Sequence, residues 1–480
     1  MFQGRRRTMK RLAYCSMITL LVVMLFGVCF LSTPASANYQ KNFPALRPMI
    51  FVHGFEGSGQ QFESQAMRFT SNGYPQNYIA VLEYDSSQFT PGGPTPTTYL
   101  LQVWTNLDQL IATLLNETGA NQVDILAHSL GTSLMYGYLT SSSARAAKVA
   151  HYVNIDGQTD YPGVPTLALW AGADPPSFAP SGRSMPNATN VTIPGVTHVE
   201  CATCAASFLQ MYEFFTGQPP KTTDILPEPS DPIWLAGRAL FFPQNVAVAG
   251  STVQIYKVNG HTGARIQNNP EATYAIDATG NWGPFKAKAG EHYEFVIVPT
   301  DNTPMHFYYE PFIRNDYLVR LLTSPAGPTG IDYYLDKSDN QSNLVISRNR
   351  ELWGDQGINN DILAINGVDV VNAAICPLSK LVTTIFAYNY HADGVGISNL
   401  NQIIPLPFFA SYFLTGVDLY IPGANPPNGR IRLVLIPRGG EGKIQLLNAP
   451  NWASTTDRIL VQFNDFLQRE DIPCSGEAPY

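Results

Sequence analysis

The sequence predicts an α/β domain in the N-terminal half of the chain and all-β domains in the C-terminal half. Up to about residue 218, apolar strand-like runs alternate with segments of helical periodicity, which is typical of a mostly parallel sheet covered by helices on both faces. Residues 219–232 are rich in Pro, Thr and acidic residues and form a linker. Beyond them, short alternating runs are separated by Gly, Asn and Pro turns, a pattern of all-β domains.

The expected elements of the first half follow one another in regular order. Strands are expected at residues 48–54, 77–85, 123–128, 150–155, 166–170 and 190–193. Helices are expected at residues 60–72, 100–115, 132–139 and 205–215. Gly73, Gly119 and Gly217 stand where three of these helices end. Residues 38–218 are therefore expected to form one domain.

The second half is divided into two expected β-rich domains, a small sandwich at residues 233–305 and a second domain at residues 306–480. The run at residues 250–258 resembles part of a carboxypeptidase-regulatory-like module. Closely spaced aromatic residues at 305–309 and 406–414 fit two interpretations. They belong to the domain cores, or they form a surface that docks on lipid or polymer.

Residues 1–37 have the features of a secretory signal peptide. Arg and Lys side chains at positions 5–11 precede an uncharged run at 12–31, and small residues end the segment at Ala37. No later segment is apolar for long enough to span a bilayer. We therefore expect a secreted, extracellular protein without a transmembrane anchor after processing.

Composition and cysteine count narrow the class further. The 480-residue chain suits two or three domains, and its 37 acidic against 29 basic residues do not favour a nucleic-acid partner. Beyond the signal segment, four cysteines in an oxidising compartment predict two disulfides, with three possible pairings among Cys201, Cys204, Cys376 and Cys474. The Cys201–Cys204 spacing stands alone, so no metal site is expected.

The stretch from Val123 to Gly131 reads Val-Asp-Ile-Leu-Ala-His-Ser-Leu-Gly and has the layout of a nucleophile elbow. An apolar strand leads into a turn and then into a helix. Small residues at Ala127 and Gly131 allow the backbone to turn sharply, which exposes Ser129 at the end of the strand. Ser129 is the candidate nucleophile.

A serine nucleophile needs a base, an acid that orients the base, and donors for the oxyanion. His198 follows the last expected strand and precedes the final helix, where it can serve as the base. Asp156 and Asp174 each follow a strand, and their spacing does not separate them as the acid; Asp160 is a weaker third candidate. His128 is expected to have a packing role.

Oxyanion donors come from backbone NH groups. We expect them at Leu130, directly after the nucleophile, and at Phe55, after the His53-Gly54 turn. The Gly57-Ser-Gly59 segment lacks the Lys-Ser/Thr of a phosphate-binding loop. No cofactor is therefore expected.

Several segments together resemble the Archaeoglobus-type lipases, which are α/β hydrolases followed by β-rich lipid-binding domains. The resemblance is carried by residues 51–69, 127–132, 155–157, 187–191 and 197–199. It implies an α/β-hydrolase domain, and it places the acid at Asp156. The family's long lid insertion is replaced here by a loop at residues 86–98, which is too short to bury a long acyl groove.

These observations predict a secreted serine esterase or lipase that hydrolyses carboxylic esters such as acylglycerols through an acyl-enzyme. The expected partners are a lipid or ester substrate and a lipid interface or polymer surface. An alternative is a depolymerase of an aliphatic polyester such as polyhydroxyalkanoate. A non-enzymatic alternative is a surface-binding protein with a degenerate hydrolase domain.

Overall fold

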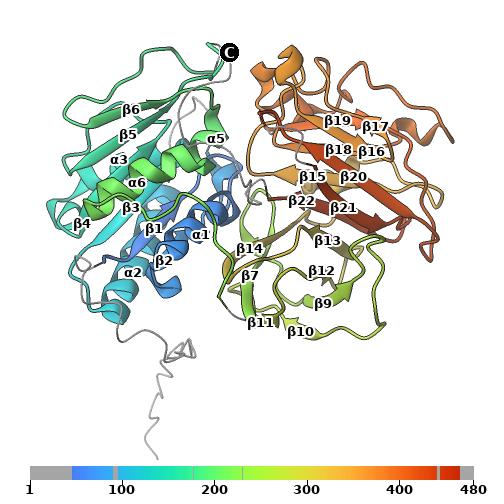
Figure 1. The fold of residues 1–480 in the computed structure, drawn as a ribbon, viewed down its shortest axis with the longest axis horizontal. Coiled ribbons are helices and arrows are strands. Elements are labelled where there is room, and N and C mark those ends of the chain that lie inside the picture. The colour runs from blue at the N-terminus through green and yellow to red at the C-terminus, as the bar shows by residue number, and fades with distance from the viewer. Residues whose placement is uncertain (1–45, 90–95, 177, 230, 440–443, 465–480) are drawn as a thin grey trace, which may run out of the picture. The chain divides into compact units, whose positions relative to one another are not determined.

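The computed structural model describes residues 46–89, 96–176, 178–229, 231–439 and 444–464 (Figure 1). The expected signal segment, Cys474 and part of the short loop at 86–98 lie outside these ranges. Among the described residues, no helix is both long and apolar enough to cross a membrane.

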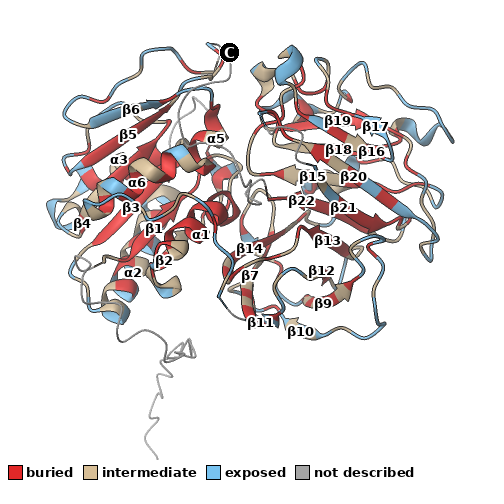
Figure 2. Cartoon of the chain, in the orientation of Figure 1, coloured by how far each residue is buried: buried red, intermediate tan, exposed pale blue. Residues whose placement is uncertain are grey.

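The first half of the described chain contains a six-stranded, fully parallel sheet. Its spatial order is β2 (Ile79–Leu82), β1 (Met49–Val52), β3 (Val123–His128), β4 (Val149–Ile155), β5 (Thr166–Ala171) and β6 (Thr189–Ile193). Strands that are buried on both faces read as continuous apolar runs, and Figure 2 shows β3 and β5 buried along most of their length. The α/β part of the predicted fold class is confirmed.

Helices cover both faces of this sheet. Their bounds are α1 (Glu63–Ser71), α2 (Thr97–Thr118), α3 (Leu130–Ser141), α4 (Ser143–Ala146), α5 (His198–Thr203) and α6 (Ala205–Thr216). Phe51 packs with residues of α1 and α6, whereas its neighbour Val52 packs with residues of α2 and α3. Gly119 and Gly217 end α2 and α6 in the left-handed conformation, at φ 70° each.

The order of the strands indicates where in the sheet a ligand is expected to bind. The chain moves from β1 to β2 on one side and then to β3 on the other, so the strand order reverses between β1 and β3. In open α/β sheets, ligands bind at the carboxyl ends of the strands beside such a switch point. His53-Gly54 follows β1 and Ser129 follows β3, so both turns border this position.

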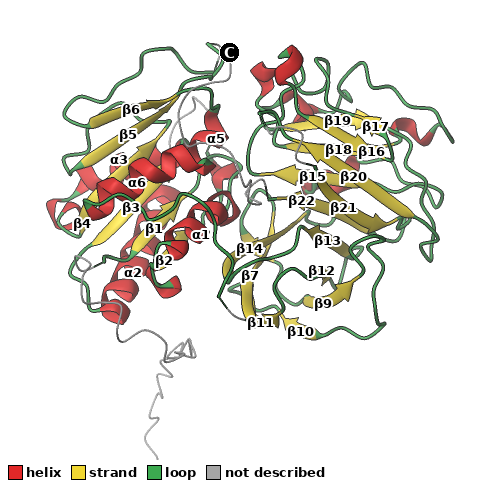
Figure 3. Cartoon of the chain, in the orientation of Figure 1, coloured by secondary structure: helices red, strands yellow, loops and turns green. Residues whose placement is uncertain are grey.

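The second half is built from strands, as Figure 3 shows, which confirms the predicted β-rich region. In the described chain, an eight-stranded sheet has the order β10 (Ala272–Ala275), β9 (Thr252–Val258), β12 (His292–Val298), β13 (Met305–Tyr309), β22 (Arg458–Phe463), β15 (Leu344–Arg348), β18 (Thr384–Tyr388) and β19 (Leu414–Asp418). β22, the last strand among the described residues, lies in the middle of this sheet and runs parallel to both neighbours.

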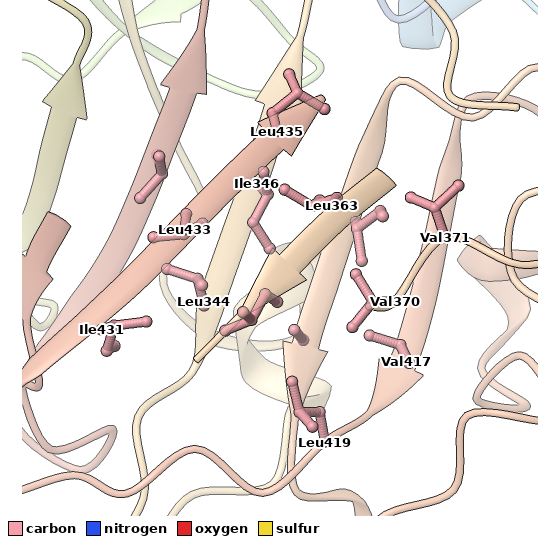
Figure 4. Close-up of a cluster of buried hydrophobic side chains, with 14 of the residues drawn as sticks. Leu344, Ile346, Leu363, Val370, Val371, Val417, Leu419, Ile431, Leu433 and Leu435 are labelled. Atoms are coloured by element: carbon pink, nitrogen blue, oxygen red, sulfur yellow. The ribbon is translucent and has the colours of Figure 1, made fainter. Parts of the chain in front are cut away.

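Two smaller sheets complete the β region in the described ranges. One contains β11 (Asn281–Ala287), β7 (Ile233–Phe241) and β14 (Asp316–Thr323), with β8 (Val246–Ala247) paired to β7. The other has the order β17 (Val368–Asp369), β16 (Ile362–Ile365), β20 (Arg430–Ile436) and β21 (Gln445–Pro450). Aliphatic side chains such as Leu363, Val417 and Leu433 fill the space between this sheet and the large one (Figure 4).

The boundary expected at residue 305 falls inside continuous sheets. β13 pairs with β12, and β14 pairs with β7, although the sequence division puts these partners in different domains. The expected linker is also fixed in place. Asn72 of the turn after α1 accepts from the NH of Lys221 at 2.7 Å, and Arg68 donates to the carbonyl of Thr223 at 3.0 Å.

Candidate active site

Ser129 lies in a sharp turn between β3 and α3. Its backbone has φ 54° and ψ −122°, which is a strained conformation for a residue other than glycine. Its NH donates to the carbonyl of Ile155 at 3.0 Å. A Cβ on Gly131 would lie 2.5 Å from the carbonyl oxygen of His53, and one on Gly54 would lie 2.9 Å from Ser129 Cβ. The close approach of the two turns therefore requires glycine at both positions.

His198 and Asp156 form a close, buried pair. Asp156 follows β4, and His198 is the first residue of α5. His198 Nδ1 and Asp156 Oδ2 are 2.6 Å apart. Burial opposes the charge on Asp156, but the hydrogen bond from His198 and the guanidinium of Arg183 hold the pKa of its carboxyl below the usual range. His198 Nε2 is buried and has no partner among the described residues, so this nitrogen is available to accept a proton.

The other candidate acid, Asp174, lies one step further from the imidazole. Arg183 Nη2 bridges the two carboxylates, at 2.7 Å from Asp156 Oδ1 and 3.2 Å from Asp174 Oδ2. Burial and the charge of Asp156 raise the pKa of Asp174, so the pair shares one negative charge, held on Asp156. Asp160 is exposed. The geometry thus favours Asp156 as the partner of His198.

Asp156, Asp174 and His198 each offer a ligand atom within 4.8 Å of the others. This spacing would suit a cation. The Arg183 guanidinium already bridges the two carboxylates, so a side chain supplies the positive charge that a metal would bring.

His128 contacts the backbone of His198. Its Nε2 lies 3.0 Å from the carbonyl oxygen of His198, and its Nδ1 lies 2.6 Å from Gln61 Nε2. Burial and the neighbouring His198 lower the pKa of His128 well below the usual value, so its ring is neutral. A neutral ring that donates from Nε2 and accepts at Nδ1 satisfies both contacts.

The two expected oxyanion donors belong to residues that follow the ends of β1 and β3. Leu130 is the first residue of α3, and the first NH groups of a helix have no acceptor within it. Phe55 lies in the turn after His53-Gly54 and lines a pocket that it shares with Ser129 and His198. This turn is closed by a hydrogen bond of 3.2 Å from the NH of Gly57 to the carbonyl of Gly54.

The pocket extends from Ser129 and His198 into the β region. Its empty volume, including the open mouth, is about 1290 Å³. The β region contributes a largely apolar wall, which includes Phe242, Leu322, Leu335, Val345, Phe386, Leu414 and Leu460. Arg458, Asp332 and Ser324 add polar groups to the lining. The C-terminal half of the described chain thus supplies much of the pocket wall.

Aromatic rings from both halves surround His198. Phe178 meets its ring edge-on at 4.5 Å between centroids, and Phe413, just before β19, stacks at 6.2 Å. Phe413 belongs to the aromatic run at 406–414, so part of that run faces the pocket. The run at 305–309 is β13 and is fully buried, as expected for a core strand.

Two further residues contact this site, and no sequence pattern predicts their position there. Asn245, beside β8, donates to the carbonyl of Gly57 at 2.7 Å and so reaches the turn that carries Phe55. Glu351 of the β region accepts from the NH of Val199, next to His198. Both are ordinary polar residues outside any motif, and they lie 188 and 152 positions from these partners.

The expectation of two disulfides is not met in the described chain. Cys201, Cys204 and Cys376 are free, and Cys201 and Cys376 are buried. The Sγ atom of Cys204 lies 3.2 Å from Ser207 Oγ. Buried thiols of this kind behave as small apolar side chains, and burial raises the pKa of Cys201.

Three family models match successive parts of the chain. A model of class 2 lipases matches residues 46–149, and a model of the lipase C-terminal domain matches residues 231–326. A third model, described as a C-terminal domain, matches residues 330–467.

Two solved structures have a low similarity to part of this chain. Lipase B of Aspergillus fumigatus is 13% identical, with a TM-score of 0.29 over 40% of this chain and 56% of that chain. A bromoperoxidase from Bacillus anthracis is 14% identical, with a TM-score of 0.28 over 36% of this chain and 92% of that chain. The two lipase models, matched in the order of catalytic and C-terminal domain, support a lipase-like hydrolase.

Proposed function

We propose that this protein is a secreted serine lipase or esterase of the Archaeoglobus type, which cleaves carboxylic esters through an acyl-enzyme. The observation that carries the proposal is the 2.6 Å pair of His198 and Asp156, with a free Nε2, beside the pocket that Ser129 also lines. The match of residues 46–149 to class 2 lipases supports the same reaction class.

Each residue has a defined step in this reaction. His198 Nε2 takes the proton of Ser129 as its Oγ attacks the ester carbonyl, and it then gives the proton to the leaving alcohol. Asp156 holds the imidazole in the tautomer that leaves Nε2 free and stabilises the imidazolium. The NH groups of Phe55 and Leu130 bind the oxyanion. Water, activated by the same His198, then releases the acid.

The largely apolar pocket favours an ester with an apolar acyl chain as the substrate. Its wall in the β region is mostly apolar, and burial contributes about 0.8 kcal/mol per CH₂ group. Catalytic efficiency should therefore rise with chain length in a series of p-nitrophenyl esters. A polyester depolymerase has to act on chains held at a surface, so comparing triolein with a polyester film separates the two substrate classes.

Replacement of the nucleophile tests the mechanism. Ser129→Ala removes the attacking oxygen, and ester hydrolysis should fall to background while the melting temperature stays near that of the wild type. Ser133→Ala, an exposed position on the same helix α3, is the matched control and should retain full activity. Turnover by Ser129→Ala at the wild-type rate would refute the mechanism, whereas a wild-type protein without activity on any of these esters would favour the surface-binding alternative.

A further inference from the structure

The short helix α5, which begins at His198, is held at its two ends by different parts of the chain. Near its C-terminal end, Gln65 Nε2 donates to the carbonyl of Ala202 at 2.9 Å, and Arg68 Nη1 donates to the carbonyl of Thr203 at 2.6 Å. Both donors belong to α1 of the hydrolase part. At the N-terminal end, beside His198, the partner comes from the β region.

That partner is Glu351, which is fully buried. Its Oε1 accepts from the NH of Val199 at 2.5 Å, and its Oε2 accepts from the NH of Glu200 at 3.0 Å. Helix NH groups in the first turn have no acceptor within the helix, and a carboxylate is the favoured partner there. One side chain of the β region therefore binds the two residues that directly follow His198.

A second contact joins the same turn to the β region. The carboxylate of Glu200 lies 2.5 Å from Arg438 Nη2 and 3.5 Å from Arg350 Nη1. Arg438 also lies 2.8 Å from Asp361 and donates to the backbone carbonyl of Glu351. Trp353 covers the Arg438 guanidinium, whose carbon is 3.8 Å from the ring centroid. Glu351 and Arg438 thus form one buried, mutually fixed unit.

We propose that Glu351 is a positioning residue for His198, so that the β region takes part in building the catalytic group as well as the pocket wall. The proposal rests on the proposed function of His198 as the base. Asp156 fixes the ring through Nδ1, but the position of the ring also depends on the backbone of the turn that carries it. Glu351 fixes that backbone at the next residue.

The test is Glu351→Gln, which keeps the size of the side chain. The NH groups of Val199 and Glu200 bond to different oxygens of the carboxylate, and the amide puts an NH₂ donor at one of these two positions, so one of the two hydrogen bonds is lost in the present geometry. With a short p-nitrophenyl ester, kcat should fall roughly 10- to 100-fold, as small displacements of a catalytic group do, while KM stays within about twofold because the pocket lining is unchanged.

The matched control is Glu291→Gln, a carboxylate of the β region that pairs with Lys257 and Lys288 at the surface. It should leave kcat unchanged. For Glu351→Gln, a kcat within twofold of the wild type or a rise confined to KM would each overturn the proposal.

Glu351→Asp serves if the Gln variant does not fold. It keeps the charge but shortens the side chain, and it should lower kcat at constant KM; an unchanged kcat would count against the proposal. Ser129→Ala in the same assay separates the two ideas. An inactive Ser129→Ala with a fully active Glu351→Gln refutes only the positioning role, whereas an active Ser129→Ala refutes the proposed function itself.

Discussion

A single hydrogen bond distinguishes the roles of two neighbouring carboxylates, Asp156 and Asp174. Asp156 contacts the imidazole of His198 directly, whereas Asp174 contacts Arg183 and has a raised pKa. We expect Asp156→Asn to lower kcat by about 10⁴-fold, because the amide favours the wrong tautomer of His198. Asp174→Asn should have a much smaller effect. Steady-state kinetics of both variants decides this, and the reverse ranking would assign the role of the acid to Asp174.

Glu56, next to the expected oxyanion residue Phe55, should make stability depend on pH. Burial raises the pKa of Glu56 to about 7, against the opposing charge of Lys380. A carboxyl with a raised pKa in the folded state binds its proton more tightly there than in the unfolded chain. Its contribution to stability is therefore complete below about pH 4.5 and is lost as the pH rises through 7.

Glu56→Gln mimics the protonated form at every pH. The variant should match the wild type near pH 4 and exceed its free energy of unfolding at pH 8, by up to about 3 kcal/mol. Denaturant unfolding at the two pH values measures the difference. Glu213→Gln, exposed on α6, is the control. Equal stability of Glu56→Gln and the wild type at pH 8 would contradict the prediction.

Some residues of the site could be predicted from the sequence and others could not, because they are brought to the site in different ways. Ser129 and Asp156 each follow a strand that is a local apolar run, and His198 follows the last expected strand of the same domain, so their order along the chain suggests a meeting point. Glu351 and Asn245 approach from distant parts of the chain through tertiary packing. No periodicity or motif marks them, and neither could be predicted.

At the level of elements, the loop of residues 54–59 depends on a side chain from the β region. Asn245 Nδ2 donates to the carbonyl of Gly57 at 2.7 Å and to that of Tyr84 at 3.2 Å, in a buried position. Asn245→Ala leaves these carbonyls without their donor, which should cost roughly 1–3 kcal/mol of stability. Displacement of Phe55 should also lower kcat about tenfold or more.

Thermal unfolding and kinetics of Asn245→Ala measure both effects. Asn268→Ala, at an exposed position of the β region, is the control and should change neither quantity. A variant with lower stability but unchanged kcat would show that Asn245 supports the fold without placing Phe55.

Most elements of the hydrolase half could be predicted, because buried parallel strands and amphipathic helices leave strong local patterns. The exceptions are short. Helix α5 has six residues, too few to show helical periodicity, and it exists because Glu351, Gln65 and Arg68 satisfy its ends. The same contacts make α5 the element through which the two halves of the chain meet at His198.

At the scale of the whole molecule, the sequence did not predict how the strands of the C-terminal half are divided among sheets. Strands β13 and β14 lie beyond the expected boundary at 305 but pair with β12 and β7 before it. Pairing between strands that are far apart in the chain leaves no local sequence pattern. The sequence therefore predicts that strands are present, but it does not predict which strands pair with each other. The fold class was predictable, whereas the joining of two β modules into one sheet was not.

The central position of β22 in the large sheet affects when that sheet can form during synthesis of the chain. Chains tend to fold from the N-terminus as they emerge from the ribosome, yet the large sheet stays split between β13 and β15 until residues 458–463 arrive. Ile459 and Leu460 of this strand also line the pocket. A nascent chain can thus assemble its six-stranded hydrolase sheet early while its substrate pocket is still unfinished. The pocket would then be complete only after residues 458–463 have been made.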